Sequence, residues 1–405
     1  MTDFDSQKKS PLKLKITTNW PLMVNNITES DRQALIEFLT DADNRLTHGP
    51  KVRKFEELWA EWLGVKHGVF VNSGASANDL SMLIVRELYG EGEVIVPPLT
   101  WVSDIASVLH ARMTPRFVDI NLRNLALNPD GVRAAITEQT KAIFLTHVLG
   151  LNGLSDELWK IAQEAGIPII EDVCESHGAT WNGKKVGTIG LLSNFSFYYA
   201  HHMTTIEGGM ICTDSDDVYA LARMMRSHGL VREIGIASKQ ELLIRAHNDL
   251  NHEFIFHSAG HNMRPTELGA VLGINQLPRL DRNIELRNRN FEYFLSHLDQ
   301  SKYVTDFNLQ GSSNYALIVV MRKEDLHRRD LIEETLRNSK IEFRRGLSGG
   351  GNQTRQPYLK KYNIRENPRD YPVADRVHSY AWYIGNYPEL QLESIDRLCS
   401  LLNSC

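Results

Sequence analysis

The sequence predicts an α/β fold, with a large domain built on a mostly parallel sheet and a smaller α+β domain after it. Between His67 and Thr213, apolar runs rich in β-branched residues alternate with segments of helical periodicity. Strands that alternate with helices form parallel sheets covered on both faces. After Gly273 this alternation gives way to a long charged helix and a shorter set of elements. The 405 residues suffice for two domains, which we expect at 1–280 and 281–405.

Seven apolar segments are expected to form a mixed, mostly parallel sheet in the large domain. Two connecting segments, Ser76–Tyr89 and Asp156–Ala165, have apolar residues at helical spacing. The second has Ser155 as a plausible N-cap and Gly166 as its stop. The expected strands are His67–Ser73, Glu93–Thr100, Pro115–Ile120, Lys141–Val148, Ile167–Val173, Leu192–Tyr199 and Met210–Thr213.

The remaining elements flank this block on both sides. The first 20 residues are polar and predict a loosely held arm of the large domain. Two helices should follow at Glu29–Leu46 and Val52–Leu63, and Gly64 ends the second. The small domain should contain helices at Leu277–Leu298, Asp330–Ser339 and Leu392–Leu402, and strands at Tyr315–Met321 and Ile341–Arg344.

The composition is that of an ordinary globular protein, with 42% hydrophobic and 23% charged residues. The net charge of −5 gives no electrostatic reason for binding nucleic acid or an anionic membrane. No apolar run reaches the roughly 20 residues that span a bilayer. The first 15 residues contain no apolar signal core, so we expect a cytoplasmic protein.

The four cysteines do not predict a metal site or a disulfide framework. Cys174, Cys212, Cys399 and Cys405 are scattered and form no C-x-x-C pair. An iron–sulfur cluster would need four well-placed thiolates, so we expect none. Cys174 and Cys212 lie in or beside apolar strands, where a buried structural thiol is the simpler interpretation.

Small residues between Asn72 and Asn78 predict an anion site. They lie at a strand-to-helix turn, where backbone N–H groups and the helix N-terminus attract a phosphate. Tight packing of strand and helix is an alternative reason for the same residues.

Two further strand ends carry candidate binding groups. Glu171, Asp172 and Glu175 follow an apolar strand, and one of these acids could pair with a cationic ring nitrogen. Capping of the next turn is equally compatible with them. Trp101 follows another strand and offers a stacking surface, although a core position is an alternative.

Two adjacent histidines follow the strand that ends near Tyr199. His201 and His202 lie in a polar loop, where imidazoles suit proton transfer near neutral pH. Surface histidines on a connecting loop are the alternative interpretation.

Together these motifs resemble the sugar aminotransferase family (DegT/DnrJ/EryC1/StrS) of pyridoxal-phosphate enzymes, over roughly residues 20–400. The resemblance implies an aspartate-aminotransferase type fold, fold type I. The motifs that carry it are Ser73-Gly74-Ala75-Ser76-Ala77, Glu171-Asp172-x-x-Glu175, Phe195-Ser196-Phe197, Glu207-Gly208-Gly209, and Gly260-His261-Asn262-Met263-Arg264 leading to Gly273-x-Asn275-Gln276-Leu277.

The resemblance implies a role for each cofactor-binding residue. Backbone N–H groups of Gly74 and Ala75, with the Ser196 hydroxyl, would bind the cofactor phosphate. Asn262 would reach that phosphate from the other subunit of a homodimer whose active site is shared. Three residues would contact the ring: Trp101 by stacking, Asp172 at the ring nitrogen, and Glu175 near the ring hydroxyl, where aminotransferases usually have glutamine.

One position departs from the aminotransferase pattern. Aligned on the motifs around Ser196 and Glu207, the position of the Schiff-base lysine contains His201. No lysine occurs between Lys185 and Lys239. Because imidazole cannot form a stable imine, ordinary transaminase turnover is not expected.

Histidine at this position, together with Glu175, resembles the 3-dehydratases of nucleotide-linked 4-keto-6-deoxy sugars, which use pyridoxamine phosphate. One branch of these enzymes adds an iron–sulfur cluster. Cys174 falls on one ligand position of that branch, but no companion cysteine occurs between Ser227 and Asn262. The chain therefore resembles the iron–sulfur-free branch, the GDP-4-keto-6-deoxymannose 3-dehydratase type, which takes its amino group from L-glutamate.

This resemblance implies dehydration at C3 of a nucleotide-linked 4-keto-6-deoxyhexose, giving a 3,6-dideoxy-4-keto sugar. Such a step belongs to deoxysugar biosynthesis, including that of lipopolysaccharide O-antigen. His201 would be the general base that takes a proton from the cofactor's C4′ carbon, and it would protonate the departing C3 hydroxyl. His202, one residue away from the lysine position, is an alternative. L-glutamate would then restore the amine form of the cofactor.

Three arginines are candidate substrate contacts. Arg345 and Arg355 lie in or beside the loop 347–358, where the family places contacts from the small domain. They could meet a sugar diphosphate or the glutamate carboxylate. Arg264 is expected near the dimer interface. A solvated loop or an ordinary ion pair is an equal alternative for each.

Two other functions remain open from the sequence. One is a sugar-nucleotide aminotransferase that works without the lysine. The other is a non-catalytic protein that binds the cofactor or a sugar nucleotide. The acid at Asp172 and the paired histidines favour an enzyme, because a non-catalytic site needs no acid–base group.

Overall fold

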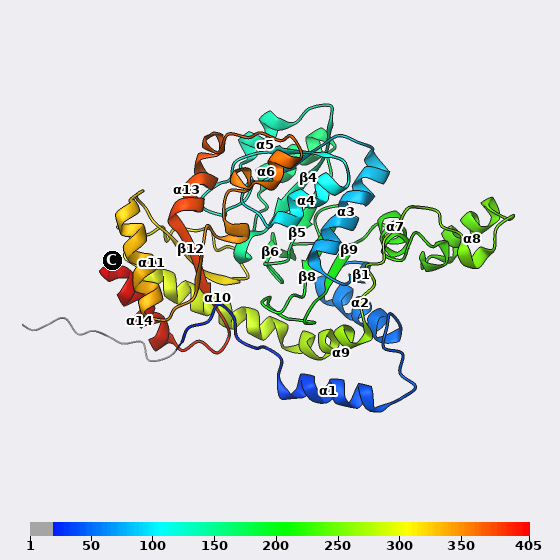
Figure 1. Ribbon diagram of the computed structural model, residues 1–405, viewed down its shortest axis with the longest axis horizontal. Helices are drawn as coiled ribbons and strands as arrows, with labels where there is room; N and C mark the ends of the chain where they lie inside the picture. The colour runs from blue at the N-terminus through cyan, green and yellow to red at the C-terminus, as the bar shows by residue number, and fades with distance from the viewer. Residues whose placement is uncertain (1–18) are drawn as a thin grey trace, which may run out of the picture.

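The computed structural model describes residues 19–405 and has the predicted α/β fold (Figure 1). Its centre is a seven-stranded mixed sheet with the order β1-β9-β8-β5-β4-β2-β3. Strand β9 pairs antiparallel with both of its neighbours, and the other pairs are parallel. The strands are β1 (His67–Val71), β2 (Glu93–Val96), β3 (Thr114–Phe117), β4 (Thr140–Thr146), β5 (Ile169–Asp172), β8 (Leu192–Ser196) and β9 (Gly209–Thr213).

All seven predicted strands are present, and several are shorter than expected. Strand β2 ends at Val96 rather than Thr100, and β8 ends at Ser196 rather than Tyr199. The chain leaves the sheet there, and Tyr198 is 43% exposed. The aromatic run beyond Ser196 therefore begins the loop that carries the two histidines.

Both faces of the large sheet are buried, as its apolar strands require. In β1, Val69 and Val71 belong to one apolar cluster, and Phe70 between them belongs to a second cluster on the other face. The helices associated with this part of the chain are α2 (Pro50–Leu63), α3 (Gly74–Tyr89), α4 (Val102–His110), α5 (Pro129–Ala135), α6 (Asp156–Ala165), α7 (Asp216–Arg226) and α9 (Glu267–Gln276).

Helix ends follow the expected capping residues in most cases. Gly64 adopts the left-handed conformation after α2, and the Ser155 side chain accepts from the Leu158 N–H at the start of α6. Helix α1 (Glu29–Thr40) is shorter than the predicted 29–46. The Asp41 carboxylate accepts from the Asp43 N–H, and this local turn competes with a further helical turn.

A second, three-stranded antiparallel sheet lies in the carboxyl-terminal part, with the order β10-β12-β11. Its central strand β12 (Ala381–Gly385) was not predicted, because it follows α13 (Pro372–Tyr380) without a turn signal between them. The other elements are β10 (Ala316–Val320), β11 (Phe343–Arg345), α10 (Leu280–His297), α11 (Leu326–Asn338), α12 (Tyr358–Lys361) and α14 (Leu392–Ser404).

The amino-terminal end of the described chain contacts this second sheet. Trp20 is buried, pairs with Ile341 in an isolated bridge, and donates its indole N–H to the Gly385 carbonyl at 3.0 Å. Residues 1–18 of the predicted arm lie outside the described residues, and its last residue, Trp20, is packed rather than loosely held. The proposed division of the chain at residue 280 stays a prediction.

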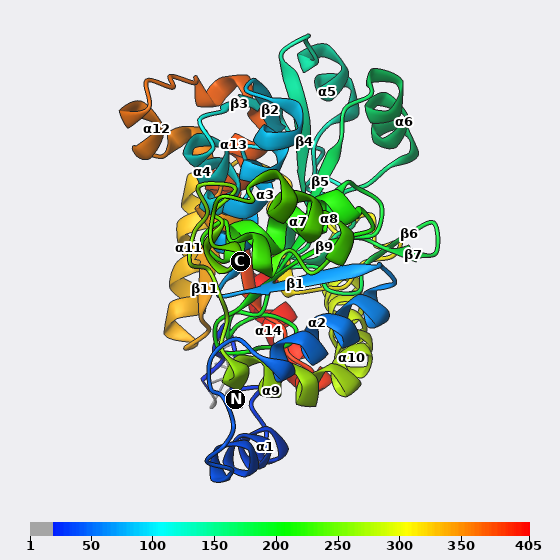
Figure 2. The ribbon, with the colours of Figure 1, turned by 90° about the vertical axis from the view of Figure 1, so that its right-hand side faces the viewer.

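Two smaller features complete the fold. The hairpin β6 (Thr180–Trp181) and β7 (Lys184–Lys185) lies at the side of the molecule (Figure 2). Helix α8 (Ala237–Ala246) projects from the body on the right of Figure 1. None of the helices within residues 19–405 combines the length and the apolar character that crossing a bilayer requires.

Candidate active site

The predicted site residues gather at one edge of the large sheet. Strands β1 and β8 both pair antiparallel with β9, so they run in the same direction as β2, β4 and β5. Gly74 and Trp101 follow the ends of β1 and β2, whereas Asp172 and Ser196 end β5 and β8. His201 lies in the loop after β8. This carboxyl edge is where open α/β sheets bind ligands.

The predicted anion site consists of the first turn of α3 and Ser196. The Ser73 side chain caps the helix by accepting from the Ser76 N–H at 3.0 Å. A Cβ at Gly74 would lie 2.6 Å from the Ser196 Cβ, so glycine allows the two segments to approach. The N–H groups of Gly74 and Ala75 occupy the first helical positions, which have no acceptor within the helix. These donors and the Ser196 hydroxyl fit a phosphate.

Trp101 and Asp172 are placed as an aromatic surface and a buried acid. Trp101 is 56% exposed at the start of α4, which excludes the alternative of a core tryptophan. Asp172 is buried, and one carboxylate oxygen accepts from the Cys174 N–H at 2.9 Å. The other oxygen accepts from Asn78 Nδ2 at 3.1 Å. The Asp172 carboxylate is therefore fixed by hydrogen bonds on both oxygens.

A second buried acid, Asp104, lies behind Asp172 and was not identified from the sequence. Asn78 Nδ2 is 2.8 Å from Asp104 Oδ1, and the Thr146 hydroxyl donates to Asp104 Oδ2 at 2.8 Å. The Thr100 hydroxyl also donates to Oδ2. Burial, and then the charge of Asp172, raises the pKa of Asp104 well above its ordinary value. The sequence signal that could have identified Asp104 is its position as an acid among the apolar residues of α4.

The rings of three histidines lie close together at this loop. His177, also not singled out in the sequence, has its ring centroid 6.1 Å from that of His201 and 5.3 Å from that of His202. Burial, followed by the nearby Arg287 cation, lowers the pKa of His201 to about 3. His201 is therefore neutral at physiological pH and can accept a proton. His202 Nε2 lies 3.1 Å from the Ser313 carbonyl, which fits a structural role.

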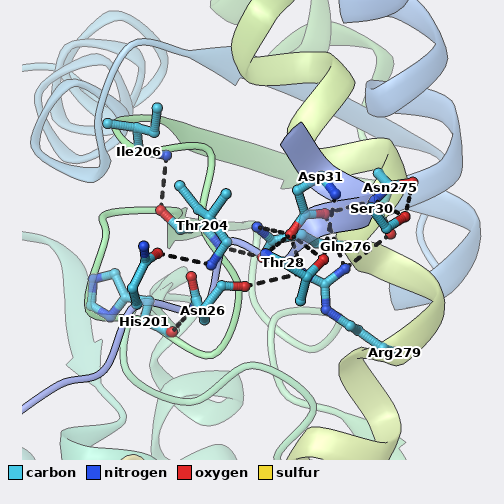
Figure 3. A network of polar contacts seen from close by, with 12 residues as sticks. Asn26, Thr28, Ser30, Asp31, His201, Thr204, Ile206, Asn275, Gln276 and Arg279 are labelled. Atoms are coloured by element: carbon cyan, nitrogen blue, oxygen red, sulfur yellow. Dashed lines mark hydrogen bonds and ion pairs between the residues drawn. The ribbon is translucent and has the colours of Figure 1, made fainter. Parts of the chain in front are cut away.

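The loop of His201 is anchored by polar contacts to the amino-terminal segment and to α9 (Figure 3). Asn26 Nδ2 donates to the His201 carbonyl at 3.4 Å, and the Thr204 N–H donates to Gln276 Oε1 at 3.0 Å. Arg279, just before α10, donates to the Asn26 carbonyl at 3.1 Å. These contacts fix the backbone of the loop, whereas His201 Nδ1 has no partner among the described residues.

Glu175 connects the sheet edge to the glycine-rich loop of the carboxyl-terminal part. Its carboxylate accepts from the Leu149 N–H at 2.9 Å and from the Ser348 hydroxyl at 3.1 Å. Burial raises the pKa of Glu175 to about 7 in spite of these hydrogen bonds, and the charge of Asp172 acts in the same direction. Glu175 can thus be protonated or ionised near neutral pH.

The three candidate arginines differ in their surroundings. Arg345 Nε lies 2.6 Å from Glu333 Oε1. Arg355 forms a bidentate ion pair with Asp375, in which Nε and Nη2 each donate to one carboxylate oxygen. In this structure, Arg345 and Arg355 are therefore both in ordinary ion pairs, as the alternative interpretation of the sequence had it. Arg264 forms no ion pair among residues 19–405 and donates to the Asn262 side-chain oxygen at 3.0 Å. Their contacts with substrate stay predictions.

All four cysteines are free, and Cys212 is fully buried as expected, whereas Cys174 is half-buried. Within residues 19–405, no group of three or more His, Cys, Asp or Glu side chains is arranged to bind a metal ion.

The chain matches known proteins over nearly its whole length. A model described as the DegT/DnrJ/EryC1/StrS aminotransferase family matches residues 25–403. GDP-4-keto-6-deoxy-D-mannose 3-dehydratase of Yersinia pseudotuberculosis is 31% identical over 400 residues, 96% of this chain and 99% of that protein. The Escherichia coli O55:H7 enzyme of the same name is 30% identical over 397 residues, covering 95% and 99%.

Solved structures agree with these sequence matches. The E. coli GDP-4-keto-6-deoxy-D-mannose-3-dehydratase with bound hydrated PLP superposes with a TM-score of 0.86 at 29% identity, over 95% of this chain and 99% of that chain. A crystal structure of GDP-4-keto-6-deoxymannose-3-dehydratase with a trapped PLP-glutamate geminal diamine superposes with a TM-score of 0.85 at 28% identity, over 95% and 100%. The aspartate-aminotransferase type fold expected from the sequence is thereby confirmed.

Proposed function

The chain belongs to the DegT/DnrJ/EryC1/StrS aminotransferase family, and we propose that it dehydrates a nucleotide-linked 4-keto-6-deoxyhexose at C3 with pyridoxamine phosphate. The product is a 3,6-dideoxy-4-keto sugar, a precursor for deoxysugar biosynthesis. The observation that carries the proposal is His201, a residue that cannot form a Schiff base, in the loop after β8 where aminotransferases of this family have a lysine. The similarity to two 3-dehydratases over almost the full chain supports it.

The residues at the sheet edge fit the cofactor. Gly74 and Ala75 would hold the phosphate through backbone N–H groups, and Ser196 would add its hydroxyl. The exposed indole of Trp101 would stack on the ring. The Asp172 carboxylate would pair with the protonated ring nitrogen. When bound, pyridoxamine phosphate supplies an amine that joins the C4 ketone of the sugar and a ring that accepts electrons.

His201 then moves the proton. Because its imidazole is neutral, it is free to accept a proton from the cofactor's C4′ carbon. The resulting imidazolium can give that proton to the departing C3 hydroxyl. A positioned proton transfer of this kind contributes about 10²–10⁴-fold in rate. An imidazole cannot hold the cofactor aldehyde, so it favours elimination over amination.

The proposal includes L-glutamate, a homodimer and a cytoplasmic location. L-glutamate restores the amine form, and its carboxylates need cationic partners, for which Arg264 is the best placed because it forms no ion pair within the described chain. Asn262 is exposed in the single chain and would reach the cofactor phosphate of the other subunit. Gel filtration with light scattering tests the dimer, and cell fractionation tests the location.

The deciding experiment incubates the protein with a panel of 4-keto-6-deoxy sugar nucleotides, pyridoxamine phosphate and L-glutamate, with mass spectrometry of the products. A 3-deoxy ketose supports dehydration, and an aminosugar would instead make the protein an aminotransferase without lysine. Absence of any product, with retained cofactor binding, would support a non-catalytic binding protein.

Variants of the two histidines test the mechanism. His201→Asn should lose at least 10²-fold in dehydration rate while it still binds pyridoxamine phosphate. His202→Asn is the matched control one residue away and should retain dehydration. If His201→Lys or His201→Asn eliminates at the wild-type rate, the role of His201 is wrong.

A further inference from the structure

Asp104 and Asp172 are two buried acids that share one amide. Asn78 Nδ2 lies 2.8 Å from Asp104 Oδ1 and 3.1 Å from Asp172 Oδ2. Asp104 is fully buried and Asp172 nearly so. The two carboxyl groups also lie within hydrogen-bond reach of each other. Asp104 comes from α4, Asn78 from α3 and Asp172 from β5, so three elements converge behind the cofactor site.

The two hydrogens of the Asn78 amide nitrogen cannot satisfy all the acceptors around it. Asn78 Nδ2 has two hydrogens but three acceptors within reach, because Ser103 Oγ lies 3.1 Å away. Asp104 Oδ2 already accepts from the hydroxyls of Thr100 and Thr146. A proton on Asp104 Oδ1 would make this oxygen a donor instead of an acceptor, so the Asn78 amide would no longer have more acceptors than hydrogens.

Counting charges leads to the same conclusion. Within residues 19–405, neither Asp104 nor Asp172 forms an ion pair with a lysine, arginine or histidine. The titratable groups that interact electrostatically with Asp104 are Asp172, Cys174 and Tyr358, and none of them is a cation. One protonated ring nitrogen could balance only one carboxylate. The N-terminus of α4 favours a negative charge, but this effect is weaker than the repulsion between two adjacent buried carboxylates.

We propose that Asp104 is a neutral carboxylic acid that donates a hydrogen bond to Asp172 and so acts as a positioning residue for the cofactor ring. This inference rests on the proposed use of pyridoxamine phosphate. Asp172 then carries the single negative charge. A hydrogen bond to that carboxylate makes it a weaker base, so the shared proton stays on the ring nitrogen. The ring is thereby kept in its stronger electron-accepting form.

Infrared spectroscopy of the cofactor-free protein tests the protonation directly. Above pH 8, ordinary carboxyl groups are ionised, so a carboxylic-acid C=O band that disappears in Asp104→Asn belongs to Asp104. Asp104→Leu, which has a similar size and no polar group, should lose the same band. If the wild-type protein shows no band that these substitutions remove, the proposal is wrong.

Cofactor binding tests the consequence. With ¹⁵N-labelled pyridoxamine phosphate, Asp104→Asn should keep the ring-nitrogen resonance and the dissociation constant close to wild type, because an amide can still donate to Asp172. Asp104→Leu should move the resonance toward unprotonated pyridine and weaken binding about tenfold. Equal behaviour of the two variants, when both are folded by circular dichroism, would overturn the role of the hydrogen bond.

These measurements are independent of the sugar. If no sugar nucleotide is dehydrated, the proposed function fails while the infrared and binding results still decide the state of Asp104. If dehydration is found but the band is absent, the inference on Asp104 fails alone.

Discussion

Glutamine in place of Glu175 should remove part of the pH dependence of folding stability. In the folded protein, burial raises the pKa of Glu175 from 4.5 to about 7. The native state therefore binds more protons than the unfolded state between these values. The contribution of Glu175 to the free energy of unfolding is complete below pH 4.5 and is lost as the pH rises through 7. At about 1.4 kcal/mol per tenfold change in proton affinity, the full loss is about 3 kcal/mol, and partial exposure of the side chain reduces it to about 2 kcal/mol.

The assay is equilibrium urea unfolding of the cofactor-free protein and of Glu175→Gln across this pH range. The variant should gain about 2 kcal/mol relative to wild type between pH 5 and pH 8. Titration of His201 and its neighbours opposes this trend in both proteins, so it cancels in the difference. Glu207→Gln, at an exposed position, controls for the loss of a charge alone. A difference that stays constant with pH, or that grows toward low pH, would refute the reasoning.

Three other substitutions have expected results that follow from packing or from a buried ion pair. Gly74→Ala should weaken binding of pyridoxamine phosphate at least tenfold in a titration, because the new Cβ would lie 2.6 Å from that of Ser196. Glu56→Gln should lower the free energy of unfolding by about 3–5 kcal/mol, because it leaves the buried Arg226 cation, now 2.6 Å from Glu56, without its charge partner. Trp20→Ala should cost about 3–5 kcal/mol by urea unfolding, since the side chain is buried against the second sheet.

Local sequence patterns predicted the large sheet well because all of its strands except the edge strand β3 are buried on both faces. Such strands are continuous apolar runs, and their ends are marked by glycine, proline or acids, as at Gly74 and Asp172. The central strand of the small sheet was missed for the opposite reason. Ala381–Gly385 follows α13 with no intervening turn residue, so only its antiparallel pairing with β10 and β11 identifies it as a strand.

A site residue could be predicted from the sequence when its type and its position at the end of a strand together indicate what it could bind. Gly74, Trp101, Asp172 and Ser196 met that condition, and all are at the carboxyl edge. Asp104 did not, because its significance comes from a neighbour far along the chain that the fold brings close. The same is true of His177, whose ring lies near those of both loop histidines only after the sheet has formed.

The surroundings of His201 also explain why lysine would be a poor substitute there. Arg287 is buried, and burial lowers its pKa to about 10. It donates to the Tyr315 carbonyl at 2.9 Å and forms no ion pair among residues 19–405. A lysine at 201 would place a second cation beside this guanidinium, whereas a neutral imidazole adds no charge. His201→Lys is therefore expected to be less stable than His201→Asn, and the difference should shrink as the pH rises and the lysine loses its proton. In the proposed function, the residue that takes the place of the cofactor's covalent anchor thus also suits an unbalanced buried arginine.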